Sequence, residues 1–551
     1  METGLEYGLI GAKLGHSFSP EIHAKIGHYP YELRELSPDG VHQLLEERTF
    51  RGLNVTIPYK ELVIPLLDEI SDRARKIGAV NTIVNRNGRL YGDNTDYSGA
   101  AALIRHAGVE ISGRKVLILG TGGTSKTLRA VTEAMGARKI VRVSRHSGEG
   151  LCTYEEAARL HSDAQVIVNT TPVGMFPNVD GCPLEVEQFP ALEGVVDVVY
   201  NPLSTRLVQS ARKLGLPAEG GLYMLCAQAV YAAGRFFDRE IDDSRIEGIY
   251  RSVLREKQNV VLIGMPSCGK TTVGRWVARR LKRPFRDTDK LIVRRAGKSI
   301  PEIFAEKGET GFRQMEAEIV AEVARESGVV IATGGGSALN PESVRRLKQN
   351  GLICFLDRPL EKLRPTGDRP LSSSTDALKK RFEERYPLYN AVCDRRLPAD
   401  GTIEENVELV LEAAGFGRKA GDGPWKNFCA AFQELRPPAA DRCIAGGRGK
   451  PYGRCSYESG YSGDHGLRSG AGSGNPSGKR TFVGEGLRRT SSSERFTAGA
   501  SLPGKRKHFA VSDPDGAVRR GRRFPRRGTS DGPRRKRLRG AAEGTRCDVR
   551  R

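Results

Sequence analysis

The feature that most constrains the fold of this chain is a pair of glycine-rich turns, each set between an apolar run and a helical stretch. The first turn lies in VLILGTGGTSKT at residues 116–127, and the second lies in LIGMPSCGKTTVG at residues 262–274. A strand that passes through glycines into a helix is a typical opening unit of a parallel sheet covered by helices on both faces. Two such openings in one chain predict two separate α/β sheets.

Further apolar runs support the same fold class. Each is short and is flanked by helical periodicity, which is the pattern of buried parallel strands between covering helices. The runs are YGLIGA, KVLILG, KIVRVS, AQVIVNT, GVVDVVY, NVVLIG, GVVIATGGG and GLICFLD. A helical stretch at 242–258 separates the two series, and we place the main domain boundary near residue 257.

Cysteine usage and hydropathy bear on the cellular compartment. The 10 cysteines are scattered, and none forms a CxxC pair or a Cys/His cluster at zinc-ligand spacing. Buried thiols in a reducing compartment are the expected state. The N-terminus has no basic-then-apolar signal, and there is no run of about 18 apolar residues. We therefore expect a cytoplasmic protein with no membrane partner.

The first glycine turn suggests a dinucleotide. Gly120, Gly122 and Gly123 would let the backbone approach a pyrophosphate at the start of the following helix. The spelling differs from G-x-G-x-x-G, so a turn without a ligand remains an alternative on this motif alone. At the end of the next strand, Ser144 and Arg145 stand where NAD-binding folds usually offer an acidic residue. An arginine there suits a 2′-phosphate, which favours NADP over NAD.

Six stretches around this turn follow the order and spacing of one enzyme family. They are GHSFSPEIH (15–23), GLNVTIPYK (52–60), GAVNTIV…GDNTD (78–96), NTTPVGM (169–175), VVYNP (198–202) and GGLYMLCAQA (220–229). Over about residues 1–245 the chain resembles the shikimate dehydrogenases. The resemblance implies a substrate-binding domain over 1–100, a Rossmann-type NADP domain over 101–245, and reduction of 3-dehydroshikimate to shikimate with NADPH.

The resemblance also implies roles for single residues. Lys60 and Asp96 match the catalytic pair, and ketone reduction needs such a pair to supply a proton while a hydride arrives. The substrate-binding residues implied are Ser17, Ser19, Thr56, Asn81, Asp96, Tyr200 and Gln228. The NADP-binding residues implied are Gly120, Thr121, Gly122, Gly123, Thr124, Ser144, Arg145, Val198 and Gly221. The family usually has alanine where Thr121 and Thr124 stand, and asparagine where Ser144 stands.

The second glycine turn is a full P-loop, Gly264-x-x-x-x-Gly269-Lys270-Thr271. Its backbone N–H groups can cradle the phosphates of ATP, Lys270 can reach the β- and γ-phosphates, and the Thr271 hydroxyl can ligate Mg²⁺. The nucleotide-binding residues predicted here are Ser267, Cys268, Gly269, Lys270, Thr271 and Thr272.

Five stretches beyond the P-loop indicate the phosphoryl acceptor. DTDK (287–290), FRQMEAE (312–318), ATGGGSAL (332–339), TGDRPL (366–371) and ERYPLYN (384–390) together resemble shikimate kinase over about 258–415. The resemblance implies that Asp287 helps to hold Mg²⁺ and that Asp289 contacts the reacting hydroxyl as a catalytic residue. It also implies that Arg313 and Arg385 bind the shikimate carboxylate. Gly334, Gly335 and Gly336 would let the backbone come close to the substrate ring, and Arg369 would contact the nucleotide phosphates. Taken singly, DTD could be a helix N-cap, GGG an ordinary turn, and the arginines solvated surface groups.

The C-terminal quarter has a different composition. Residues 417–551 hold 31 Lys and Arg against 12 Asp and Glu, which is +19 of the whole-chain +22 and leaves +3 on residues 1–416. The segment is rich in Gly, Ser, Arg and Pro, so we expect it to be disordered. It could bind nucleic acid as a basic arm. We favour an inert or artefactual tail, because the kinase resemblance ends at EAAGFG (412–417).

Taken together, these features predict a bifunctional enzyme of chorismate and aromatic amino-acid synthesis that makes shikimate and then phosphorylates it with ATP. The domains expected are 1–100, 101–245, a linker helix over 246–257, a kinase domain over 258–416 and the tail over 417–551. One alternative is an idle module or a preference for a related substrate such as quinate. Another is a nucleic-acid-binding protein on an enzyme scaffold, which the near-neutral charge of residues 1–416 disfavours.

Overall fold

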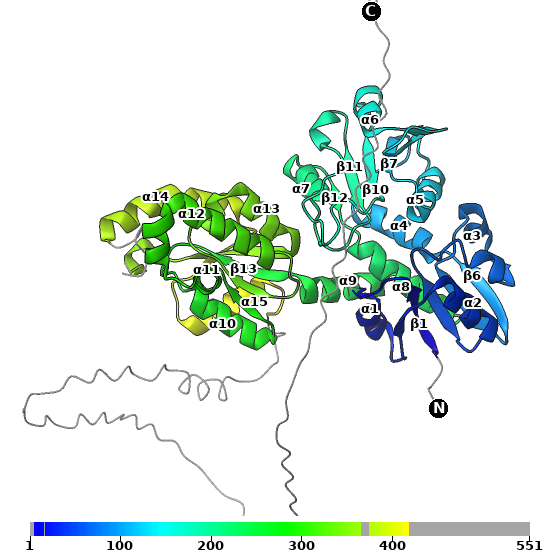
Figure 1. The fold of residues 1–551 in the computed structure, drawn as a ribbon, viewed down its shortest axis with the longest axis horizontal. Helices are drawn as coiled ribbons and strands as arrows, with labels where there is room; N and C mark the ends of the chain where they lie inside the picture. The colour runs from blue at the N-terminus through cyan, green and yellow to red at the C-terminus, as the bar shows by residue number, and fades with distance from the viewer. Residues whose placement is uncertain (1–4, 16, 365–373, 418–551) are drawn as a thin grey trace, which may run out of the picture. The chain divides into compact units, whose positions relative to one another are not determined.

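The computed structural model describes residues 5–15, 17–364 and 374–417 (Figure 1). Arg369 and the tail from residue 418 onward lie outside the described residues. The contact expected of Arg369, and the disorder and nucleic-acid binding considered for the tail, therefore stay predictions.

The N-terminal lobe is built on a six-stranded sheet with the strand order β2-β1-β3-β5-β6-β4. Its strands are β1 (Tyr7–Gly11), β2 (Glu32–Glu35), β3 (Gly52–Val55), β4 (Glu69–Ile70), β5 (Thr82–Arg86) and β6 (Arg89–Asp93). The helices of this lobe are α1 (Ser19–Ile26), α2 (Pro38–Glu47) and α3 (Asp72–Ile77), with a short 3₁₀ turn at Ile64–Leu66.

This sheet is mixed, whereas the apolar runs of the sequence predict parallel sheets. β1 runs parallel to β2 and β3, but β5 runs antiparallel to both β3 and β6. The physical reason is the two-residue turn Asn87-Gly88, in which both residues have positive φ, at 54° and 85°. Asn-Gly in this conformation is the favoured connection of a tight β-hairpin, so β5 and β6 must pair antiparallel.

The middle lobe has the predicted parallel sheet, in the order β12-β11-β10-β7-β8-β9. Its strands are β7 (Lys115–Leu119), β8 (Lys139–Val143), β9 (Leu151–Cys152), β10 (Val166–Asn169), β11 (Gly194–Asp197) and β12 (Ala218–Glu219). Its helices are α5 (Gly123–Ala134), α6 (Tyr154–Leu160) and α7 (Arg206–Lys213), with a 3₁₀ turn at Val186–Gln188. Counted from β7, this is the 3-2-1-4-5-6 order of dinucleotide-binding folds.

Alternation along β7 shows that both faces of this sheet are covered. Leu117 and Leu119 belong to one apolar cluster, while Val116 and Ile118 belong to another. Because successive side chains of a strand point to opposite faces, each face of the sheet packs against its own layer. Burial on both sides accounts for the unbroken apolar run VLIL at 116–119 that the sequence shows.

Three helices accompany the two lobes: α4 (Thr95–His106), α8 (Leu222–Phe236) and α9 (Ser244–Lys257). The last of these confirms the helix predicted over 242–258. It buries Ile246, Ile249, Tyr250 and Val253 in a cluster shared with α1 and α8. This spacing forms one apolar helix face, so the segment expected to be a linker helix contributes to a hydrophobic core.

The P-loop domain has a five-stranded parallel sheet in the order β14-β15-β13-β16-β17, with β13 at its centre (Figure 1). The strands are β13 (Asn259–Ile263), β14 (Phe285–Asp287), β15 (Val330–Ala332), β16 (Gly351–Asp357) and β17 (Arg395–Pro398). The helices are α10 (Lys270–Leu281), α11 (Thr288–Ala296), α12 (Ile300–Val323), α13 (Pro341–Asn350), α14 (Thr375–Val392) and α15 (Ile403–Ala413), and 3₁₀ turns lie at Ser337–Leu339 and Leu360–Lys362.

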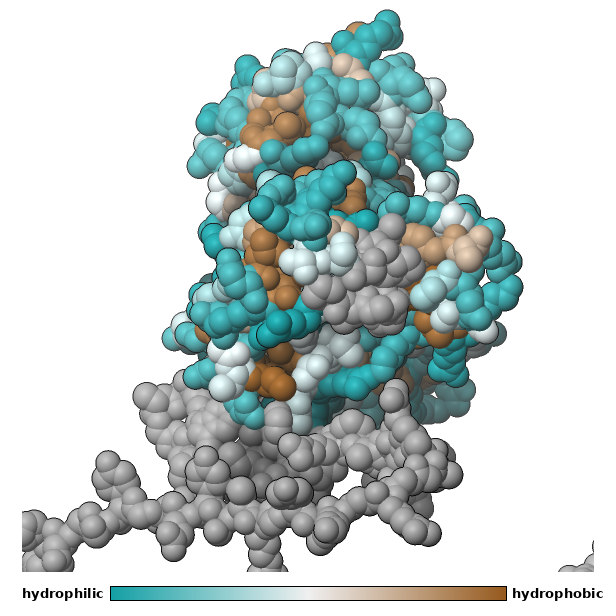
Figure 2. Space-filling view, turned by 90° about the vertical axis from the view of Figure 1, so that its left-hand side faces the viewer, coloured by the Kyte–Doolittle hydropathy of each residue, from teal (hydrophilic) through white to brown (hydrophobic). Residues whose placement is uncertain are grey.

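The surface is largely polar. Figure 2 shows a mainly hydrophilic face on which hydrophobic residues form small, separate patches, as on most folded proteins. Among the described residues, no helix is long and apolar enough to cross a membrane. The expected cytoplasmic location stays a prediction.

Candidate active sites

A cleft of about 380 Å³ contains the predicted substrate residues of the first half. Its walls come from the ends of β1, β3 and β11 and from α4 and α8, which are distant in the sequence. The cleft is lined by every predicted substrate and catalytic residue of this half: Ser17, Ser19, Thr56, Lys60, Asn81, Asp96, Tyr200 and Gln228. Thr124, Val198 and Gly221, predicted to contact NADP, also line it.

Lys60 and Asp96 meet inside this cleft. Lys60 Nζ lies 2.5 Å from Asp96 Oδ2, and their side chains are only 16% and 11% exposed. The two residues are therefore not separate solvated charges. A lysine that bonds a carboxylate inside a cleft is placed to donate a proton to a bound substrate. Their catalytic role stays a prediction.

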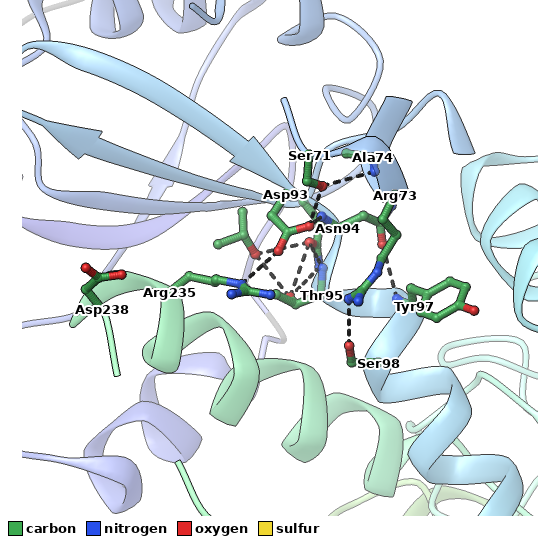
Figure 3. Close-up of polar contacts among 12 residues, drawn as sticks. Ser71, Arg73, Ala74, Asp93, Asn94, Thr95, Tyr97, Ser98, Arg235 and Asp238 are labelled. Atoms are coloured by element: carbon green, nitrogen blue, oxygen red, sulfur yellow. Dashed lines mark hydrogen bonds and ion pairs between the residues drawn. The ribbon is translucent and has the colours of Figure 1, made fainter. Parts of the chain in front are cut away.

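The start of α4, which carries Asp96, is fixed by polar contacts on two sides (Figure 3). Asp93 Oδ2 accepts a hydrogen bond from Arg235 Nε of α8 at 2.8 Å, and its Oδ1 accepts one from Ser71 Oγ at 2.6 Å. Asn94 caps the helix by accepting from the backbone N–H of Tyr97. Its amide also donates to Ala79 O at 2.9 Å. These contacts leave the Asp96 carboxylate little freedom to move away from Lys60.

The hydroxyl groups of the cleft are also held in place. Ser19 opens α1, and its Oγ lies 3.1 Å from Ser17 Oγ, so the two serines form one polar group at a helix start. Tyr200 packs edge-on against Phe18 with ring centroids 5.3 Å apart. Burial raises the pKa of Tyr200, which keeps its phenol protonated and able to donate.

The first glycine turn has the shape that a pyrophosphate needs. Gly120 has φ 109°, a conformation that favours glycine, and Ser125 Oγ donates to its carbonyl oxygen at 2.7 Å. Gly122 precedes α5, and no side chain caps the first N–H groups of that helix. Ser144 and exposed Arg145 lie at the carboxyl end of β8, where the sequence placed the 2′-phosphate contact.

The P-loop is held by its own lysine. Gly264 and Gly269 have φ 145° and 101°, which lets the chain wrap around a phosphate-sized space. Lys270 is buried, and its Nζ donates to Gly264 O at 2.9 Å and to Met265 O at 2.8 Å. The lysine is thereby placed over the loop.

Asp287 caps a helix with one carboxylate oxygen and faces Thr271 with the other. Its Oδ1 accepts from the backbone N–H of Lys290, which makes it the N-cap of α11, and its Oδ2 accepts from Thr271 Oγ1 at 2.8 Å. The two adjacent oxygens suit Mg²⁺, which prefers oxygen ligands. Among the described residues, no group of three or more His, Cys, Asp or Glu side chains could hold a metal ion. Two protein oxygens are typical for a magnesium ion that also binds nucleotide phosphates.

The predicted acceptor residues gather around the Gly334–Gly336 loop. Arg385 Nη1 donates to Gly335 O at 3.0 Å, and the Arg313 guanidinium lies where a side chain at Gly336 would have to be. A Cβ at Gly334 would lie 2.6 Å from Asp289 Oδ1. A side chain at Gly334 or Gly336 would occupy the space that these functional groups take in the structure. The individual roles stay predictions.

The sequence reading missed one charged residue at this loop. Glu316 is 2% exposed, accepts from Arg313 Nη1 at 2.7 Å and accepts from Ser337 Oγ at 2.7 Å. Burial works against the charge of Arg313, but Glu316 and Glu309 outweigh it and raise the pKa of Arg313. The signal was present in FRQMEAE, where Arg313 and Glu316 are three residues apart on a helix and thus on one face.

Comparisons with known proteins agree with this geometry. The family model for the shikimate dehydrogenase substrate binding domain matches residues 9–83, and the shikimate kinase model matches residues 266–414. The NADP(+)-type shikimate dehydrogenase of Clostridium perfringens strain SM101 is 37% identical over 265 residues, which are 45% of this chain and 97% of the relative. The chain belongs to the shikimate dehydrogenase family. It also contains a shikimate kinase domain.

Other relatives and solved structures cover the same dehydrogenase part. The shikimate dehydrogenase (NADP(+)) of Halothermothrix orenii is 38% identical over 261 residues, which are 41% of this chain and 88% of the relative. A Thermus thermophilus shikimate 5-dehydrogenase structure in complex with NADP(H) and shikimate has 31% identity and a TM-score of 0.41, covering 45% of this chain and 99% of that one. A chorismate mutase/shikimate 5-dehydrogenase fusion of Clostridium acetobutylicum has 35% identity and a TM-score of 0.43, covering 45% and 96%.

A buried carboxyl behind the dehydrogenase cleft generates a pH prediction. Asp197 lies at the end of β11 and accepts from Asn169 Nδ2, Val199 N and Thr205 Oγ1 at 3.0, 3.0 and 2.7 Å. Burial raises the pKa of Asp197 to about 7 although these three donors lower it. The folded state therefore keeps a proton that the unfolded state releases near pH 4.

We expect the stabilisation from this proton to be complete below about pH 4 and to be lost as pH rises towards 7. Urea inactivation of dehydrogenase activity, followed from pH 5 to 8, measures it. As the pH rises from 5 to 8, the urea concentration at half-inactivation of the wild type should fall relative to that of Asp197→Asn. Asp238→Asn, at an exposed site in the same module, should follow the wild type. Parallel curves for wild type and Asp197→Asn would contradict the expectation.

The P-loop itself generates a stability prediction. Ser267 has φ 64°, a left-handed conformation that costs a non-glycine residue about 1–2 kcal/mol. We expect Ser267→Gly to stabilise the P-loop domain by about 0.5–1 kcal/mol, after allowing for the greater backbone entropy of glycine in the unfolded chain. The urea midpoint for loss of kinase activity measures this. A lower midpoint in the variant would mean that the serine side chain makes a stabilising contact that outweighs the strain.

Proposed function

We propose that this chain catalyses two successive reactions, in which 3-dehydroshikimate is reduced with NADPH to shikimate and shikimate is then phosphorylated by ATP to shikimate 3-phosphate. The observation that supports this most directly is the joint occurrence of two sites. One is the cleft that brings Lys60 and Asp96 together among six further predicted substrate residues. The other is the P-loop near two arginines and Asp289 at one glycine loop.

In the first reaction, NADPH supplies the hydride to the carbonyl carbon. The residues of this chain handle the proton. Lys60 donates a proton to the carbonyl oxygen as the carbon is reduced. Until this proton is transferred, the positive charge of Lys60 stabilises the negative charge that develops on the oxygen. Asp96, 2.5 Å away, accepts a hydrogen bond from the Lys60 ammonium and keeps it aimed into the cleft. The serine pair at the start of α1 is suited to the substrate carboxylate.

In the second reaction, positioning dominates, because phosphoryl transfer through a loose transition state needs little covalent help. Arg313 and Arg385 hold the shikimate carboxylate, for which planar guanidinium groups are well matched. This orients the ring so that a hydroxyl faces Asp289. Lys270 binds the phosphates of ATP. Mg²⁺, bound by Thr271 and Asp287, would neutralise phosphate charge.

One mixture with two variants tests this function. Purified protein receives 3-dehydroshikimate and NADPH, and Mg-ATP is added when NADPH oxidation has settled. The wild type should oxidise NADPH and then form shikimate 3-phosphate. Lys60→Met should lower the dehydrogenase kcat by about 10²–10⁴-fold and leave phosphorylation of added shikimate unchanged. Lys270→Met should lower the rate of shikimate phosphorylation and leave the reduction of 3-dehydroshikimate unchanged.

Each variant is the folding control of the other, because each keeps one activity in the same chain. Turnover of quinate with NAD, without turnover of 3-dehydroshikimate, would assign the first site to the related substrate. NADPH oxidation without phosphorylation would leave the kinase part of the proposal wrong.

Cofactor preference gives a second test. We expect Arg145→Gln to raise the KM for NADPH by about 10–100-fold, since a hydrogen bond between charged groups contributes about 1.5–3 kcal/mol. The KM for NADH should stay unchanged, because NADH has no 2′-phosphate. Arg138→Gln removes the same charge from another exposed position of the same lobe and should alter neither KM. Equal rises for both cofactors would show that Arg145 does not read the 2′-phosphate.

A further inference from the structure

A chain of hydrogen-bonded polar side chains runs to the wall of the dehydrogenase cleft, which its members Asn54 and Asn81 line, and of these residues only Asn81 is a predicted substrate contact. It consists of Tyr31, Asn54, Thr82, Asn81 and Thr95, and is called the relay below. Asn54, Thr82, Asn81 and Thr95 are between 0% and 4% exposed. Buried polar groups are costly unless they are bonded, so such a chain has one favoured arrangement of donors and acceptors.

Two backbone groups determine the direction of the relay. The backbone N–H of Thr95 lies 2.7 Å from the side chain of Asn81, and only an oxygen can accept from it, so Asn81 Oδ1 faces Thr95. The backbone carbonyl of Asn81 can only accept, so the atom of Asn54 that lies 3.3 Å from it is Nδ2. Asn54 Oδ1 is then left to accept from the Tyr31 hydroxyl at 2.8 Å. These backbone contacts identify the oxygen and the nitrogen of each side-chain amide, and the side-chain contacts of the relay then hold the amides in these orientations.

Thr82 links the two asparagines. Its Oγ1 accepts from Asn54 Nδ2 at 3.2 Å and lies 3.0 Å both from Asn81 Oδ1, to which it can donate, and from Thr95 Oγ1. Asn81 Nδ2 donates in turn to Thr95 Oγ1 at 3.1 Å. In Figure 3, dashed lines converge on Thr95 at the start of α4, next to the capping residue Asn94. One N–H of the Asn81 amide remains for the cleft, which Asn81 lines.

The Tyr31 end of the relay is kept in its donor form. The Tyr31 ring stacks on the His23 ring, with centroids 3.7 Å apart and an angle of 10° between the planes. Burial raises the pKa of Tyr31, so the phenol keeps its proton. Burial also lowers the pKa of His23 to about 3, so no imidazolium charge lies beside it. The first donor of the relay is therefore the neutral Tyr31 hydroxyl, which keeps its proton at neutral pH.

We propose that Tyr31, Asn54 and Thr82 are positioning residues that hold Asn81 as an N–H donor towards an oxygen of the dehydrogenase substrate. The ligand class that this geometry selects is a small molecule with a hydroxyl or carbonyl oxygen that accepts at Asn81, and not one with a donor there. The proposal rests on the proposed dehydrogenase function. Because Thr95 directly precedes Asp96, the same contacts also place the amide relative to the Lys60–Asp96 pair.

The test compares hydroxyl deletions inside and outside the relay in the full chain. Tyr31→Phe and Thr82→Val each remove one hydroxyl from the relay and keep the side-chain shape. Thr82→Ser keeps the hydroxyl. Tyr29→Phe is the matched control, because the Tyr29 hydroxyl belongs to the same aromatic group but pairs with His23 Nδ1 rather than with a residue of the relay. KM and kcat are measured for 3-dehydroshikimate and for NADPH.

We expect Tyr31→Phe and Thr82→Val to raise the KM for 3-dehydroshikimate by about tenfold, the effect of one weakened hydrogen bond, while the KM for NADPH changes less than about twofold. Thr82→Ser and Tyr29→Phe should behave like the wild type. A general loss of structure would instead lower kcat and raise both KM values, and kinase activity in the same sample reports on the integrity of the rest of the chain.

Two outcomes would overturn the proposal. One is a KM for 3-dehydroshikimate in Tyr31→Phe and Thr82→Val that equals that of the wild type. The other is a rise in Thr82→Ser or Tyr29→Phe as large as in Thr82→Val. A wild-type chain that does not reduce 3-dehydroshikimate is a different result, since it would refute the proposed dehydrogenase function itself.

Discussion

The starts of two helices that have no side-chain cap are the constraint on which both halves of this protein depend. Helices α5 and α10 each begin directly after a glycine turn, with no side-chain cap on the first turn of the helix. The first backbone N–H groups of such a helix need an acceptor, and a phosphate supplies both the oxygens and the negative charge that the helix dipole favours. Because both helices follow central strands of parallel sheets, each turn lies at the carboxyl edge where the other site residues also end.

Two largely buried ion pairs lie in the predicted sites of the two modules. Lys60 meets Asp96 in the dehydrogenase cleft, and Arg313 meets Glu316 beside the glycine loop of the kinase domain. Removing a charge from water costs several kcal/mol, and a close opposite charge offsets much of this. In both sites one member of the pair is also a predicted substrate contact. Each ion pair thus stabilises a charge that is largely removed from water and also holds that charge in position for the substrate.

The sequence predicted the parallel strands well because a strand buried on both faces is an unbroken apolar run, as in VLIL at 116–119 and VVLI at 260–263. It gave less information on the mixed sheet, where the decisive signal was the two-residue turn Asn87-Gly88 rather than any periodicity. Family motifs located the residues that line the cleft. Glu316, Asn54 and Thr82 were missed, since their importance lies in what they contact, and a single Glu, Asn or Thr has no pattern of its own.

The two modules are joined directly, but each forms its predicted active site from its own residues. Helix α9 ends at Lys257 and strand β13 begins at Asn259, so the dehydrogenase part passes into the kinase domain with one residue between the two elements. Each site is nevertheless assembled from its own module. The dehydrogenase cleft is lined by residues between Leu9 and Gln228, and the described kinase residues lie between Gly264 and Arg385. Within the described residues, neither predicted site draws a catalytic side chain from the other module. The fusion therefore fixes equal amounts of the two enzymes in one chain, and their chemistry follows from two separate turns rather than from a shared one.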